Sequence, residues 1–389
     1  LVTRLRRAGA ILVGKSNVPE AMYLHETVNT IWGRSNHPLD SRRNPGGSTG
    51  GDAALVAAGV VPLAIGNDLA GSLRQPAHAC GIAAIVPRSV ALGDGGAVDT
   101  MPGLTLVRPR AGFLARSVDD LAVAVEATGG PAPGAAAGAL RRVAWWDETG
   151  PVPPSPAVRR AVREAVAILD RHGVETVQVP ATIALEAAWL MLGILSADGG
   201  AEIRSLYGGR RPMPGVRRLL AIAGFPPGWR PVLATVLRAI GRRIEAEGVL
   251  RTGWRNAAGR AALAEARDRL ASRCTELLAG CDAAVCPVSA VPAMRHGAGG
   301  RLVVAAGPCL LANLLDLAAG AVAVTTVRAD EERSRPPSLD PVLRAAAATD
   351  RESAGLPVGV QVIAAPGRDE ATVLAVMRLI EASRPGAAA

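Results

Sequence analysis

The stretch from Asn44 to Gly81 reads NPGGSTGGDAALVAAGVVPLAIGNDLAGSLRQPAHACG. It holds two glycine-flanked serines, Ser48 and Ser72, separated by the pattern of a small-residue helix and an apolar strand. Glycine beside Ser48 allows a tight turn and a close approach to another segment. The run from Asp68 to Ser72 can aim successive backbone N–H groups at one point, as an oxyanion hole requires. The stretch therefore predicts serine chemistry on an α/β scaffold.

The glycine-rich loop around Ser48 has a second interpretation, a loop that cradles phosphate. A nucleotide P-loop places Gly-Lys before a Ser or Thr, so that the lysine meets the phosphates. Here the loop ends in Gly51-Asp52, and a carboxylate at that place repels phosphate. The sequence therefore disfavours a nucleotide site.

The remainder of the chain alternates buried strands with helices. With 389 residues, 49% hydrophobic and 3% aromatic, the core is expected to be close-packed from small side chains. VAWW and TVQVP predict strands on either side of a helix from Ser155 to His172, a βαβ-like unit. AAVCPVSAVPA, AGAVAVTTV and LPVGVQVIAA predict further buried strands, and Asp369 to Ala382 a closing helix. The region 183–278 reads as helical, broken at GFPPGW.

Charge and cysteine usage exclude several function classes. The net charge is +9, but 42 of the 43 basic residues are arginines scattered along helices, which disfavours a nucleic-acid partner. The longest apolar stretch is interrupted by Pro308 and Asp316, so no membrane span is expected. Five cysteines and five histidines match no zinc or redox spacing, which predicts no metal or cofactor and a cytoplasmic protein.

The pattern around the two serines resembles the amidase signature family. GGSTGG, the 24-residue step from Ser48 to Ser72, and GSLRQPA carry the resemblance. GKSNVPEAMY, ARSVDDLA, NLLDLAAGAVAVTTV and GLPVGVQVIAAPGRDE extend it along the chain, toward fatty-acid-amide-hydrolase-like amidases. The resemblance implies an α/β fold with a mixed central β-sheet sandwiched between helices and a helical cap region.

The resemblance also implies roles for individual residues. Ser72 falls on the nucleophile that forms the acyl-enzyme and Ser48 on the serine that relays its proton. A lysine, acting through that serine, accepts the proton, because a hydroxyl alone is a weak nucleophile. The remaining implied positions are Leu69, Ala70 and Gly71, whose amides join that of Ser72 in the oxyanion hole, and Met22 in the substrate pocket. The implied substrate is a small-molecule carboxylic acid amide, and a homodimer is possible.

The lysine is the main departure from the family pattern. Lys15, the only lysine, suggests a triad with Ser48 and Ser72, but the resemblance aligns it with a structural lysine. The catalytic lysine of the family lies on a strand upstream of GKTN, and arginine stays protonated and cannot replace it. We therefore expect an N-terminally truncated chain that is nearly inactive by itself, with a non-catalytic pseudoenzyme as the alternative.

Four smaller expectations concern Ala70, the start of the chain, a thiol mechanism and the domain organisation. Ala70 replaces a usual glycine, and its methyl group would strain the loop if φ were positive there. The start LVTRLRRAGA predicts a helix, and ILVGK, residues 11–15, an apolar strand after it. A thiol amidase of nitrilase type would need a Glu, Lys and Cys constellation and is disfavoured. A single domain is expected, divided into 1–128, a connector 129–140, 141–280 and 281–389.

Overall fold

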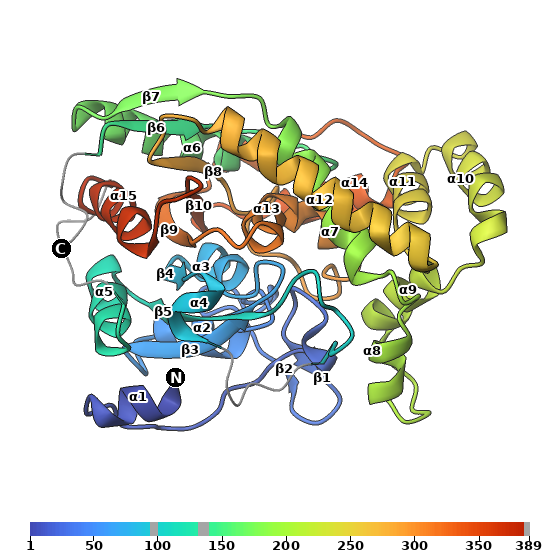
Figure 1. Cartoon of the computed structure of the whole chain (residues 1–389), viewed down its shortest axis with the longest axis horizontal. Helices are drawn as coiled ribbons and strands as arrows, with labels where there is room; N and C mark the ends of the chain where they lie inside the picture. The colour runs from blue at the N-terminus through green and yellow to red at the C-terminus, as the bar shows by residue number, and fades with distance from the viewer. Residues whose placement is uncertain (94–99, 131–139, 385–389) are drawn as a thin grey trace.

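The centre of the molecule is an eight-stranded mixed sheet (Figure 1). The computed structural model describes residues 1–93, 100–130 and 140–384. The strand order is β3-β5-β4-β9-β10-β8-β6-β7, antiparallel from β3 to β8 and parallel from β8 through β6 to β7. The strands are β3 (Leu63–Asp68), β4 (Ala83–Val86), β5 (Arg110–Ala115), β6 (Arg142–Trp145), β7 (Glu175–Gln178), β8 (Ala283–Pro287), β9 (Ala319–Thr326) and β10 (Pro357–Ala364). The predicted mixed α/β architecture is confirmed.

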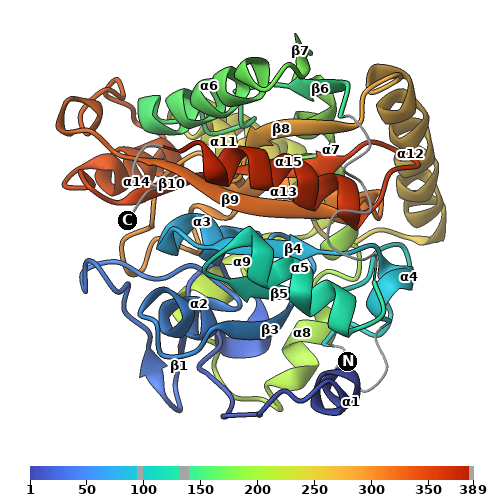
Figure 2. The same cartoon turned by 90° about the vertical axis from the view of Figure 1, so that its left-hand side faces the viewer.

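Helices cover both faces of this sheet (Figures 1 and 2). Along β10, Val358, Val360 and Val362 pack into one core cluster, whereas Ile363 packs into another on the opposite face. This is the period-2 alternation of a buried strand. The first face is covered by α5 (Val118–Ala127), α6 (Pro156–Arg171) and α15 (Glu370–Ala382), and the second by α2 (Gly50–Ala57), α3 (Arg74–Cys80), α7 (Thr182–Leu195), α12 (Ala257–Leu277) and α13 (Gly307–Leu314).

The remaining helices lie outside these layers. In Figure 1 the helices from 201 to 251 gather at the end of the molecule away from α15. They are α8 (Ala201–Leu206), α9 (Pro214–Ala223), α10 (Arg230–Ala239) and α11 (Arg243–Arg251). The others are α1 (Val2–Arg7), α4 (Ser89–Leu92) and α14 (Pro341–Asp350), and a two-stranded hairpin joins β1 (Val28–Asn29) to β2 (Gly33–Arg34). No helix in the described ranges is long and apolar enough to cross a membrane.

The predicted βαβ-like unit is present. The Ser155 hydroxyl caps α6 by accepting from the Val158 N–H at 3.4 Å, and Pro156 occupies the first turn. The flanking strands β6 and β7 pair in parallel, with Val143 opposite Thr176. The cap and the one-sided apolar stripe were sufficient to locate this helix.

The strand predicted at 11–15 is wrong. Residues 11–15 belong to no strand or helix, and Ile11, Leu12 and Val13 are 89%, 65% and 79% exposed. No described segment pairs with this backbone, so the apolar run remains uncovered. The predicted connector 129–140 falls largely on 131–139, which lie outside the described residues.

Candidate active site

Two segments place the predicted serines next to each other. Ser48 lies just before α2, and Ser72 lies between β3 and α3. The Thr49 N–H donates to the Ser72 carbonyl oxygen at 3.1 Å, which ties the two segments together. Ser48 is 2% and Ser72 8% exposed, and the Gly47–Ser48 peptide bond is cis. Among the described residues no hydrogen bond links the two hydroxyl groups.

Close packing explains the glycines beside Ser48. A Cβ atom on Gly47 would lie 2.6 Å from the Leu24 carbonyl oxygen and 2.7 Å from the Glu26 nitrogen. A Cβ atom on Gly50 would lie 2.3 Å from the Thr27 hydroxyl oxygen. The serine loop therefore packs directly on the backbone of residues 24–26 and on the side chain of Thr27, which a larger side chain would prevent.

A buried carboxylate holds the loop that carries Ser72. Asp68, at the end of β3, is fully buried and accepts from the Gly71 N–H at 2.7 Å and the Leu73 N–H at 3.1 Å. Its carboxylate also pairs with the Arg74 guanidinium, at 2.8 Å and 3.1 Å. The chain is thus bent around one carboxylate, and Ser72 lies at the bend.

Arg74 extends this anchorage to the C-terminal half of the chain. Its guanidinium donates to the Cys309 carbonyl oxygen at 3.0 Å and to the side-chain oxygens of Asn313 and Gln361. Burial alone would raise the pKa of Asp68, but Arg74 and the two backbone N–H groups hold it well below its usual range. Burial opposes the charge of Arg74, yet Asp68 outweighs this effect and raises the pKa of the guanidinium. Both groups therefore stay ionised in the interior.

The peptide between Ala70 and Gly71 is fixed at both ends. Its carbonyl accepts from Nε2–H of His25 at 2.9 Å, and its N–H is the one bonded to Asp68. Burial lowers the pKa of His25, and Nε2 carries a proton because the Ala70 carbonyl oxygen can only accept. The N–H of Gly71 is thus already occupied, whereas Leu69, Ala70 and Ser72 have no N–H bond to a described acceptor.

The expected strain at Ala70 is absent. The described non-glycine residues with positive φ are Ala21, Met22, Asp316 and Glu352, and Ala70 is not among them. Gly71, with φ +99°, makes the left-handed turn instead. An alanine is therefore compatible with this loop.

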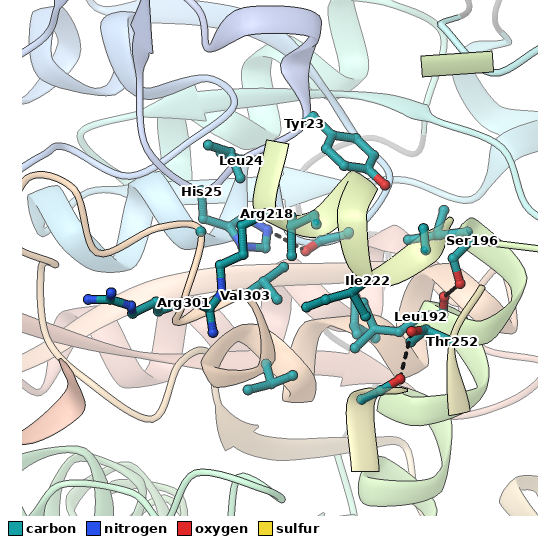
Figure 3. A pocket seen from close by; sticks show the side chains of 18 of the residues that line it. Tyr23, Leu24, His25, Leu192, Ser196, Arg218, Ile222, Thr252, Arg301 and Val303 are labelled. Carbon is teal, nitrogen blue, oxygen red and sulfur yellow. Dashed lines mark hydrogen bonds between the residues drawn. The ribbon is translucent and has the colours of Figure 1, made fainter. Parts of the chain in front are cut away.

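An apolar pocket opens beside Ser72 (Figure 3). Its lining includes Leu69, Ala70 and Ser72, and the segment 21–25 contributes Met22 and His25. Side chains from the helical region form other parts of the wall: Trp189, Leu192, Leu195, Leu219, Ile222 and Ile244. Four of the six predicted site residues line this pocket, whereas Ser48 and Gly71 lie behind its surface.

The alternative nucleophiles and bases fit poorly. Lys15 is exposed and forms no hydrogen bond with either serine in the described part of the chain. All five cysteines are buried as free thiols, and burial raises the pKa of Cys274 and Cys309 to about 11 and of Cys286 to about 12. No group of His, Cys, Asp or Glu among the described residues could hold a metal ion.

Comparison with known proteins decides the family. The model of the family described as Amidase matches residues 1–373. The chain belongs to the amidase family. It is 31% identical to fatty-acid amide hydrolase 1 of Sus scrofa over 98% of this chain and 69% of that protein. It is also 26% identical to fatty acid amide hydrolase 1 of Caenorhabditis elegans, over 99% of this chain and 71% of that relative.

Solved structures of amidase-family proteins have the same fold. A fatty acid amide hydrolase superposes with a TM-score of 0.78 at 19% identity, covering 97% of this chain and 67% of that one. A 6-aminohexanoate cyclic dimer hydrolase superposes with a TM-score of 0.71 at 22% identity, covering 100% and 78%. The resemblance to fatty-acid-amide-hydrolase-like amidases is confirmed, and the chain is an amidase-family hydrolase.

The residues that hold the Ser72 loop in place were not predicted from the sequence. Asp68 and Arg74 stand inside the stretch from Asn44 to Gly81, and their six-residue spacing at a strand–helix turn was the available signal. His25 gave no signal, because its partner, the Ala70 carbonyl, is a backbone atom 45 residues away.

Proposed function

We propose that the protein hydrolyses a carboxylic acid amide to an acid and ammonia or an amine, with Ser72 as nucleophile. The observation that carries the proposal is the position of Ser72, which lines an apolar pocket and lies on a loop whose peptide groups are fixed by Asp68 and His25. Preorganised N–H groups of this kind stabilise the charge that develops on an attacked carbonyl oxygen.

In the proposed mechanism the Ser72 oxygen attacks the amide carbon as its proton passes to Ser48, and Ser48 passes its own hydroxyl proton on to a base, which requires the two hydroxyl groups to hydrogen-bond when substrate is bound. The oxyanion is stabilised by the N–H groups of Leu69, Ala70 and Ser72, because that of Gly71 is bonded to Asp68. The C–N bond then breaks, the nitrogen takes up a proton, and the acyl group remains on Ser72 until water releases it. Met22 contacts the acyl part at the pocket wall.

In this scheme the rate is limited by the base that accepts the proton from Ser48. The family pattern places a lysine there, and Lys15 is exposed instead. Loss of one member of a catalytic unit costs about 10³- to 10⁶-fold in turnover while the oxyanion hole still contributes. We therefore expect the 389-residue chain to acylate slowly.

Active-site labelling tests the proposal. The chain is treated with a fluorophosphonate, and the modified peptide is identified by mass spectrometry, with hydrolysis of a long-chain primary amide measured in parallel. We expect labelling at Ser72, none in Ser72→Ala, and slower labelling in Ser48→Ala. Ser272→Ala, an exposed serine of α12, is the matched control. Labelling that survives Ser72→Ala would refute the nucleophile.

A second candidate is a non-catalytic protein that keeps the fold for binding. The exposed position of Lys15, the only lysine, favours it. The two candidates differ in the same experiment, because a binding protein would bind an amide in the pocket yet remain unlabelled after prolonged exposure.

A further inference from the structure

Two arginines line the mainly apolar pocket. Arg218 comes from α9 and Arg301 from the turn that precedes the short 3₁₀ helix Val303–Ala306. Figure 3 shows both on the side of the pocket where Val303 lies, with Tyr23 and Ser196 on the other side. A mechanism of amide hydrolysis on Ser72 does not use them.

The two backbone segments that carry these arginines meet. Gly215 and Gly300 meet so closely that a Cβ atom on Gly300 would lie 2.7 Å from the Gly215 Cα. The turn before Arg301 is further fixed by Glu26, whose carboxylate accepts from the Gly297 N–H at 2.6 Å and the Gly299 N–H at 3.0 Å. Arg301 is therefore exposed at its tip but mounted on an ordered turn.

The charges around them do not balance. Glu245, also at the pocket, pairs with both Arg218 and Arg242, so one carboxylate serves two guanidinium groups. No carboxylate in the described part of the chain forms an ion pair with Arg301. Burial lowers the pKa of Arg218, and the positive charges of Arg301 and Arg242 lower it further, whereas the carboxylate of Asp340 acts in the opposite direction.

An unpaired guanidinium on an apolar wall suits a ligand that is apolar along its length and anionic at one place. Guanidinium groups bind carboxylates through paired N–H donors, and these charge-assisted bonds are stronger than neutral ones. A solvated surface arginine is the simple alternative, but it would not explain why two arginines are brought together at the pocket with one carboxylate shared between Arg218 and Arg242.

We propose that the substrate is an amide with an apolar body that also bears a carboxylate, which Arg301 binds and Arg218 supports. The amide part of this statement rests on the proposed function. The carboxylate part does not, because it concerns binding in the pocket. The carboxylate can belong to the acyl chain, as in a dicarboxylic acid monoamide, or to the amine, as in an N-acyl amino acid.

Calorimetric titration of the Ser72→Ala protein tests the proposal without turnover. One arm compares the monoamide of dodecanedioic acid with dodecanamide, and the other compares N-dodecanoylglycine with N-dodecanoylethanolamine. In at least one arm we expect the carboxylate ligand to bind about tenfold more tightly, the difference that one charge-assisted hydrogen bond provides.

Two variants test whether Arg301 causes the preference for carboxylate ligands. Arg301→Gln should lower the carboxylate preference about tenfold. Arg217→Gln removes the same charge from an exposed position on α9 that does not line the pocket, and should preserve the preference. Equal affinities within both arms, or equal effects of the two variants, would overturn the carboxylate site. Fluorophosphonate labelling of Ser72 in the unmutated chain would meanwhile report on the proposed function separately.

Discussion

Replacing Arg74 by methionine probes the support beneath the nucleophile. Arg74 and Asp68 are both fully buried and 2.8 Å apart, so the substitution leaves a carboxylate in the interior without its counter-charge. Removing one partner of a buried pair costs about 3–5 kcal/mol. That is a large part of the ~5–15 kcal/mol by which a typical protein is stable.

The free energy of unfolding can be measured by urea titration with circular dichroism as the signal. The matched control is Arg142→Met, since Arg142 pairs with Glu175 at the surface and such pairs contribute about 0–1 kcal/mol. We expect the control to lose little and Arg74→Met to lose several kcal/mol more. Equal losses in the two variants would refute the reasoning, because they would mean that water reaches Asp68.

The remaining predictions concern the same site and its surroundings. His25→Phe removes the donor to the Ala70 carbonyl and should slow labelling of Ser72 about tenfold. His25→Gln, which keeps a donor, should recover much of the rate. Equal rates in both variants would show that the hydrogen bond from residue 25 does not support the Ser72 loop. Gly47→Ala places a methyl group against backbone atoms of residues 24–26 and should cost about 1–3 kcal/mol in the same urea assay. Gly228→Ala, whose added methyl group meets no atom within 4 Å, should cost less. The free energy of unfolding should fall by about 2 kcal/mol between pH 7.5 and 5.5. Burial lowers the pKa values of His25, His37 and His78, so the unfolded chain binds more protons than the folded one as the pH falls. Burial raises the pKa of Asp350 to about 6, and this carboxyl group therefore adds stability as the pH falls. A rise in stability toward pH 5.5 would show that the histidines do not dominate.

Much of the fold could be predicted because its signals are local. Ser155, Pro156 and a one-sided apolar stripe locate α6, and buried β10 reads directly as an apolar run. The same rule failed at Ile11 to Val13, because an apolar run becomes a strand only where a partner strand and a covering layer exist.

The site was predictable in part for a related reason. Ser48 and Ser72 carry a family spacing, so their proximity could be inferred from sequence, although their roles stay proposals. The hydrogen bond of the Gly71 N–H could not be inferred from sequence, since it depends on how the chain bends around Asp68. The contacts of Arg74 with Asn313 and Gln361 join residues 239 and 287 positions apart, which no local pattern reveals.

These long sequence separations affect how the protein folds during translation. A ribosome releases the nucleophile segment long before it translates residues 309–361, so Arg74 emerges without three of its acceptors. Contacts this distant in sequence form late and slowly. The nascent N-terminal half should therefore remain sensitive to proteases and dependent on chaperones until translation passes β10, and only then should the hydrolytic centre take shape.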